Sequence, residues 1–249
     1  MNDPQRTPAH DVIAIPDLLE WVRHSWLEGR LHDLSHPMAD GMLIPPALRR
    51  AGQRVTIEPI ATHQRHGFEA GRFAAVVHSG THVDAPRHFV ADGARLGELG
   101  LAPFIGPAHV VDLRGLGANE PVTARLLEQR AHARPGFIYL LCSGWGEACW
   151  GTEAYWSEGP YLADDAAEWL VANGARAVGF DFFQERAARH DIVRPELYTT
   201  HRTLLAAGIP LIEHLTNLTP LVGRDVFFIC LPWYLAGAEG APARAVALT

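Results

Sequence analysis

The second half of the chain alternates short apolar runs with segments of helical spacing that stop at a glycine. The expected strands cover residues 137–142, 177–181, 210–213, 226–231 and 243–248, and the expected helices cover residues 162–173 and 195–207. Apolar runs of this length between turn residues are typical of buried strands. Gly174 and Gly208 follow the two helices, where glycine commonly ends a helix. This alternation predicts an α/β fold.

The first half is richer in strands and loops. We expect strands over residues 32–38, 73–77 and 109–113, and a short helix over residues 122–130. A mixed sheet therefore fits better than a pure doubly wound one. The length of 249 residues favours one domain, and 48% hydrophobic with 20% charged residues is a globular composition. No stretch approaches the length of a membrane span, so no membrane partner is expected.

The N-terminal segment has the pattern of an amphipathic helix that stands outside the main domain. Pro16 and Asp17 open it and Gly29 lies near its end. We therefore expect an extension over residues 1–30, helical in part, and a domain over residues 31–249. The apolar side chains of this helix are Leu18, Leu19, Trp21, Val22 and Trp26. A face of this kind is costly in water, which predicts a homodimer or higher homo-oligomer.

Charge and cysteine content limit the partners and the compartment. The formal charge is -7, and no run of Lys or Arg is long enough to follow a phosphate backbone, so nucleic acid is not expected. Three cysteines cannot form a complete set of disulfides, and no two are spaced as zinc ligands. Residues 1–15 lack the apolar core of a signal peptide. The expected location is the cytoplasm.

The densest group of chemically reactive side chains is residues 78–88, His-Ser-Gly-Thr-His-Val-Asp-Ala-Pro-Arg-His. An extended path from His82 to Asp84 points both side chains to one side, and a turn at Gly80 brings His78 over the same point. Two imidazoles and a carboxylate suit zinc, manganese or iron with a position left open. The alternative is a polar loop of surface or capping histidines, which the density of ligands disfavours.

The pattern His-x-Gly-Thr-His-x-Asp-x-Pro-x-His resembles the signature of the cyclase family of metal-dependent hydrolases, which includes bacterial kynurenine formamidases and isatin hydrolases. The resemblance continues in residues 33–37, 104–113 and 240–244, and so spans residues 31 to 248. It implies a single mixed-sheet domain of the swivelling β/β/α type, with the N-terminal helical extension outside it.

The resemblance also implies a second group of ligands. In the two-metal formamidases of the family, a helix histidine and a downstream strand glutamate complete the site, and His201 and Glu213 match that pattern. It implies one ion on His78, His82 and Asp84, and a second on Asp84 and His201, with Glu213 reaching one or both. The expected cofactor is one or two Zn or Mn ions. Without the resemblance, His201 would be interpreted as a histidine on the face of a helix and Glu213 as a carboxylate that is capped or paired.

The implied chemistry is hydrolysis of a small-molecule amide. A bound divalent ion lowers the pKa of its water to about 7 and polarises the carbonyl. His88, beyond the ligands, is the expected general acid/base. The expected bond is an acyl C–N bond in an aryl formamide or a cyclic amide. The alternatives are a cyclase or lactone hydrolase of the same family, a non-catalytic metal-binding member, and a cupin-like oxygenase, to which His201 and Glu213 add no support.

One segment departs from the formamidases. They carry Thr-Pro-Ser after a Gly-x-Asp strand end, whereas residues 179–184 read Gly-Phe-Asp-Phe-Phe-Gln. N-formylkynurenine is therefore not a secure substrate. Phe182 and Phe183 are expected either in the pocket wall or in the core, and Gln184 as a donor to a substrate carbonyl.

The remaining motifs carry weaker signals. His36 is expected to line the pocket or to make a structural hydrogen bond, and His63 and His66 to be solvated or in a substrate loop. Ser143 lacks the first glycine of a serine-hydrolase elbow, and Gly115-Leu116-Gly117 lacks the third glycine of a dinucleotide site.

Overall fold

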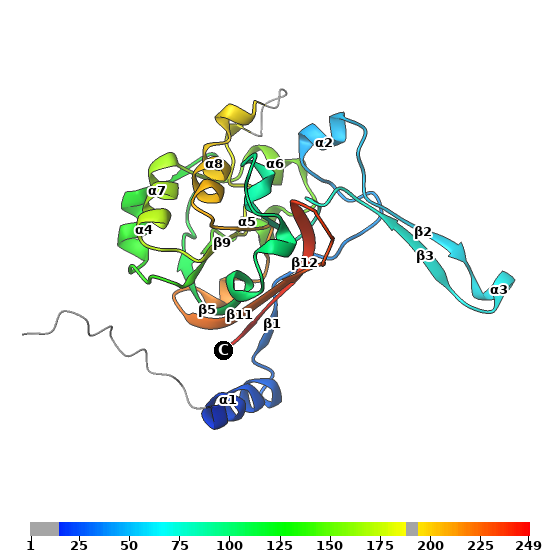
Figure 1. The fold of residues 1–249 in the computed structure, drawn as a ribbon, viewed down its shortest axis with the longest axis horizontal. Coiled ribbons are helices and arrows are strands. Elements are labelled where there is room, and N and C mark those ends of the chain that lie inside the picture. The colour runs from blue at the N-terminus through cyan, green and yellow to red at the C-terminus, as the bar shows by residue number, and fades with distance from the viewer. Residues whose placement is uncertain (1–14, 188–193) are drawn as a thin grey trace, which may run out of the picture.

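A sheet that closes on itself forms the centre of the molecule (Figure 1). The structure is a computed structural model that describes residues 15–187 and 194–249. Within those residues eight strands pair in the order β1-β12-β11-β5-β7-β9-β10-β4, and β12 also pairs with β4. All strands of this sheet except β1 therefore form a closed ring. The bounds are β1 (Leu31–Asp33), β4 (His82–Asp84), β5 (Ile105–Asp112), β7 (Ile138–Cys142), β9 (Ala177–Phe180), β10 (Leu211–Glu213), β11 (Asp225–Pro232) and β12 (Gly240–Leu248).

The sheet is mixed, as the sequence predicts. β5, β7, β9 and β10 run parallel, and the other pairings in the ring are antiparallel. β12 closes the ring with its first residues, since Gly240 to Pro242 pair with β4, while Val246 to Leu248 pair with β1. The α/β prediction with a mixed sheet is confirmed.

Two layers of apolar side chains cover the two faces of the ring. Every ring strand contributes to one cluster, which fills the interior and includes Val83, Leu140, Ile212 and Phe228. The second cluster lies between the outer face and the helices α4 (Ala124–Arg130), α7 (Asp164–Ala172) and α8 (Thr199–Ala206). Residues of β7 alternate between the two clusters and are all buried, which explains its unbroken apolar sequence.

The expected strand over residues 73–77 is misplaced. The strand there is β3 (Ala70–Ala74), which pairs with β2 (Thr56–Ala61) in a separate hairpin that projects from the body (Figure 1). Phe73 is 36% exposed and Ile60 is 62% exposed, because these strands pair with each other in the hairpin and do not join the closed sheet. Four-residue α3 (His63–His66) forms its tip.

Short elements connect the layers. They are α2 (Pro46–Arg50), β6 (Pro121–Val122), α5 (Trp145–Cys149), α6 (Glu153–Ser157), β8 (Tyr161–Leu162) and the 3-10 turns 86–88, 96–98, 102–104, 195–197 and 219–221. The expected helix over residues 195–207 is thus a 3-10 turn followed by α8. Among the described residues, every helix is too short or too polar to cross a lipid bilayer.

The N-terminal helix α1 (Ile15–Leu27) lies beside the C-terminus, at one end of the molecule (Figure 1). Ser25 Oγ donates a hydrogen bond to the Thr249 carbonyl, and the Trp21 ring meets Phe227 edge-on, so Trp21 is not on the free face that the sequence suggests. Leu19 and Trp26 are about two-thirds exposed, at 64% and 66%. The division into an extension and a domain at residue 30 stays a prediction.

Candidate metal centre

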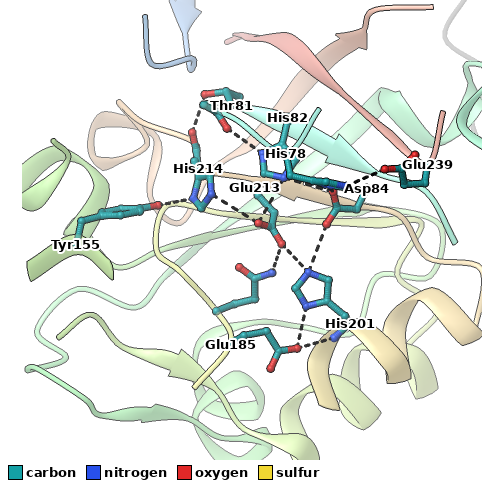
Figure 2. Close-up of polar contacts among 12 residues, drawn as sticks. His78, Thr81, His82, Asp84, Tyr155, Glu185, His201, Glu213, His214 and Glu239 are labelled. Atoms are coloured by element: carbon teal, nitrogen blue, oxygen red, sulfur yellow. Dashed lines mark hydrogen bonds and ion pairs between the residues drawn. The ribbon is translucent and has the colours of Figure 1, made fainter. Parts of the chain in front are cut away.

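The candidate ligands converge on the outer face of the ring, where β4 and β10 lie side by side. Glu213 is the register partner of His82, and Leu211 that of Asp84. Val83 points into the ring interior, so His82 and Asp84 on either side of it point outward. Figure 2 shows these side chains gathered with His201 beneath them. The expected extended path from His82 to Asp84 is therefore present.

His78 joins this group because the chain turns at Gly80. Gly80 has a positive φ of 62°, and a Cβ there would collide with Met38, so glycine is required. The turn places His78 Nδ1 2.6 Å from Asp84 Oδ1. The other ring nitrogen, His78 Nε2, lies 3.5 Å from Oε1 of Glu239, the residue that precedes β12.

His201 comes from α8 and lies between the two carboxylates. Its Nε2 is 3.3 Å from Asp84 Oδ2 and 3.0 Å from Glu213 Oε1. Its Nδ1 lies 2.9 Å from Glu185 Oε1, which also accepts the His201 backbone N–H. A carboxylate on Nδ1 sets the ring so that Nε2 faces the site, as is common for histidines that ligate metals.

The donor set fits a divalent metal ion. His82 Nδ1 faces the Gly80 carbonyl at 2.8 Å, which leaves His82 Nε2 directed at the site. That nitrogen and Asp84 Oδ2 are buried and have no hydrogen-bond partner among the described residues. Three sets of ligand atoms each lie within 4.8 Å of one another, namely His78–His82–Asp84, His82–Glu213–His214 and Asp84–His88–His201. Buried orphan ligand atoms of mixed nitrogen and oxygen type are what a divalent ion satisfies.

The charges in the site also favour a cation. Burial and the nearby Asp84 oppose ionisation of Glu213, yet His201 and His82 lower its pKa to about 2. Burial opposes protonation of His78, but the Asp84 carboxylate raises its pKa to about 10. Without an ion, the two carboxylates are therefore balanced by protons on histidines, and a divalent ion replaces those protons when it binds.

His88 ends the 3-10 turn Pro86–His88 and reaches the same place. Its ring stacks on His78 with centroids 3.9 Å apart and lies 5.6 Å from the His201 ring. Burial lowers the pKa of His88 to about 4, against the opposing pull of Asp84, so the ring is neutral near pH 7. His88 is close enough to the other groups either to transfer a proton or to bind a metal ion. Its role as general acid/base stays a prediction.

A cavity of about 180 Å³ opens over these groups. Its polar floor is made of the six predicted site residues His78, His82, Asp84, His88, His201 and Glu213. Its walls are apolar or aromatic and consist of Pro45, Ala47, Leu48, Phe89, Phe183 and Tyr198. The sequence-predicted residues thus share one cavity, and their assignment as ligands stays a prediction.

Several residues of the site were not foreseen or were given another role. Gln184 is fully buried and its amide donates to Glu213, so the expected contact with a substrate carbonyl is not what the structure shows. Phe182 packs in the outer core and Phe183 lines the cavity. Glu185 and His214 carry no sequence signal, because their positions depend on α8 packing and on a backbone turn.

The three other histidines singled out in the sequence, His36, His63 and His66, lie outside the cavity. His36 stacks on Trp150 with centroids 3.9 Å apart, and burial lowers its pKa to about 4. This is a structural contact rather than pocket lining. His63 and His66 lie exposed at the hairpin tip, consistent with the solvated reading.

Three comparisons with known proteins bear on this site. The family model described as "Putative cyclase" matches residues 32–184. Kynurenine formamidase of Bacillus cereus is 30% identical over 176 residues, which cover 71% of this chain and 78% of that protein. The solved structure of a potential metal-dependent hydrolase with cyclase activity has a TM-score of 0.68 at 25% identity, covering 87% of this chain and 96% of that one. An isatin hydrolase bound to thioisatinate has a TM-score of 0.81 at 21% identity, covering 95% and 99%.

Proposed function

This chain belongs to the cyclase family, and we propose that it is a metal-dependent hydrolase that cleaves the acyl C–N bond of a small aryl amide or cyclic amide. The observation that carries the proposal is the convergence of four imidazoles and two carboxylates on the floor of one apolar cavity. The curated relative named as a kynurenine formamidase supports the reaction class.

The ligands in this proposal are His78, His82, Asp84, His201 and Glu213. When bound, a divalent ion makes water a nucleophile near neutral pH and polarises the carbonyl that is attacked. The mixed imidazole and carboxylate set suits Zn or Mn. The two Asp84 oxygens face different histidines, with Oδ1 toward His78 and His82 and Oδ2 toward His201, which favours two ions over one.

His88 moves the proton in this proposal. Its neutral ring accepts a proton during water attack and returns it to the leaving nitrogen, a role usually worth about 10² to 10⁴ in rate. The stack on His78 fixes the ring plane over the polar floor of the cavity. Phe89 and Phe183 exclude water from the walls, which strengthens charge interactions inside.

The cavity lining favours an uncharged, planar substrate. The chain contains no lysine, and no arginine lines the cavity among the residues that the structure describes. A substrate carboxylate would lose its hydrating water on entering the cavity, and no lysine or arginine in those walls would compensate for that loss. Aromatic walls pack well on a flat ring. A neutral cyclic aryl amide such as isatin fits these terms better than N-formylkynurenine, which carries an amino-acid head group.

A substrate panel with metal analysis tests the proposal. Isatin, N-formylkynurenine, simple aryl formamides and matched lactones would be assayed with protein of known Zn and Mn content, before and after chelator treatment. We expect turnover of the neutral amides that chelation abolishes and metal restores. Preference for lactones would favour the lactone-hydrolase alternative, and metal-free protein with chelator-insensitive activity would refute the mechanism.

We also propose that the protein works as a homodimer or higher homo-oligomer in the cytoplasm. The support is the exposed apolar surface of α1, at Leu19 and Trp26, and of the projecting hairpin, at Ile60 and Phe68. A two-stranded hairpin is marginally stable in water by itself, so a covering surface stabilises it. The support for the compartment is the three free cysteines.

A further inference from the structure

Two buried side chains, His214 and Tyr155, extend in line from the predicted ligand Glu213, and the proposed reaction does not use them. Tyr155 Oη lies 2.7 Å from His214 Nδ1, and His214 Nε2 lies 3.6 Å from Glu213 Oε2. Tyr155 and His214 are 0% exposed. Figure 2 shows the three residues in line, with Glu213 at the end that faces the candidate ligands.

The backbone at His214 is held in an unusual conformation to make this possible. Residues that follow one another in a strand point to opposite faces, so His214 would point away from Glu213 if β10 continued. Instead its φ is +58°, a left-handed value that is uncommon outside glycine. Thr81 Oγ1, from the sequence motif, donates to the His214 carbonyl at 2.6 Å and holds the turn in place.

The hydrogen bonds select one tautomer of His214. A neutral imidazole carries its proton on one nitrogen only. If Nδ1 carried it, Nδ1–H would donate to Tyr155, and the phenol proton would have no acceptor among the described residues. A buried hydroxyl without an acceptor is costly. If Nε2 carries the proton, Tyr155 donates to Nδ1, and the Nε2–H lies 3.6 Å from Glu213 Oε2, beyond hydrogen-bond distance but within reach of the carboxylate charge. In the other tautomer the Nε2 lone pair would meet that negative charge instead, which is unfavourable.

We propose that His214 is a positioning residue that presents an Nε2–H to Glu213, and that Tyr155 sets its tautomer. His214 is then not a metal ligand, although its ring nitrogen lies within ligand range of His82 and Glu213. Gln184 and His201 meet Glu213 on Oε1, whereas His82 Nε2 and His214 Nε2 each lie 3.6 Å from Oε2. The proposal rests on the proposed function only in treating Glu213 as a ligand.

Nuclear magnetic resonance of the full-length chain tests the tautomer directly. With ¹⁵N-labelled histidine, long-range ¹H–¹⁵N spectra distinguish protonated from unprotonated ring nitrogens, and His214→Gln identifies the His214 signals by their loss. We expect Nε2–H in both chelator-treated and zinc-loaded protein. A proton on Nδ1 in either state would overturn the proposal. A chain without zinc affinity would refute the proposed function but leave the chelator-treated measurement intact.

Zinc affinity of matched variants separates positioning from ligation. His214→Gln keeps an N–H at the position of Nε2, so its affinity should stay within about tenfold, while His214→Phe should lose about 10- to 100-fold. Equal losses in both variants would make His214 a ligand. Tyr155→Phe should shift the His214 Nδ1 resonance and lower zinc affinity about 10-fold. Tyr139→Phe is the control, because within residues 15–187 and 194–249 that buried phenol bonds only to the backbone, at Arg134 and His132.

Discussion

Gly240 offers a test of the metal site that removes no ligand. It opens β12 opposite Asp84 of β4, where the ring closes. A Cβ at this position would lie 2.8 Å from His78 Cε1, 3.2 Å from His78 Nδ1 and 2.8 Å from the Val83 carbonyl oxygen. The two approaches at 2.8 Å are closer than a real Cβ tolerates, and the Val83 oxygen belongs to the backbone of a strand. In Gly240→Ala, the His78 ring must therefore leave the position that holds its Nδ1 2.6 Å from Asp84 Oδ1.

The expected size of the effect follows from these contacts. Overpacking of this kind costs about 1 to 3 kcal/mol, which lowers Tm by roughly 2 to 12 °C in a chain of this size. Displacing His78 should also weaken zinc binding by about 10- to 100-fold. The stabilisation that zinc adds should then fall by about 1.4 to 2.8 kcal/mol.

Thermal unfolding with and without zinc, together with a chelator competition titration, measures both effects. Gly71→Ala in β3 is the control, because its Cβ would meet only the Glu58 carbonyl oxygen, at an ordinary 3.6 Å. If Tm falls while zinc affinity is unchanged, His78 does not ligate from this position. If neither changes, the close approach of β12 to His78 is wrong.

Four further predictions follow from the site. Asp84→Ala should lose metal and activity together, because both of its oxygens face histidines; full metal content with normal turnover would give Asp84 a structural role. His88→Ala should keep its metal and lower kcat on an amide by about 10² to 10⁴, with activated esters less affected; metal loss in proportion to activity would make His88 a ligand. In chelator-treated protein, the lowered pKa of Glu213 stabilises the fold at pH values above 4.5, its ordinary pKa, and this stabilisation is lost as the pH falls to about 2. Glu213→Gln should therefore flatten the acid side of a plot of Tm against pH. An unchanged plot would contradict the pairing of Glu213 with His201. Light scattering at micromolar concentration should give at least a dimer, and a monomer would oppose the association.

The family and the α/β class could be predicted from the sequence because their signals are local. β7, α7 and β9 follow from apolar periodicity and from Gly174 at a helix end, which depend on neighbours in sequence. The motif is local as well, since His82 and Asp84 share one face of a strand through the alternation of side chains. His201 and Glu213 were placed only through the family resemblance.

The β2–β3 hairpin could not be predicted in the same way. Its apolar residues are exposed, so the pattern that marks buried strands pointed to the wrong arrangement. The same limit applies to α1, where Trp21 belongs to the apolar stripe but packs on Phe227 of a strand two hundred residues later in the chain.

What the sequence determined by itself is the alternation of strands and helices in the second half of the chain and the groups able to bind a metal, because periodicity and side-chain chemistry belong to the residues. Only the tertiary structure decided how those groups meet. Ring closure brings Gly240 of β12 opposite Asp84 of β4, and Glu239, just before β12, next to His78, just before β4. The packing of α8 places His201 between two carboxylates. The left-handed turn at His214 sets that ring beside Glu213. These contacts arise from long-range pairing and from a backbone angle selected by burial, and neither leaves a periodic trace along the chain.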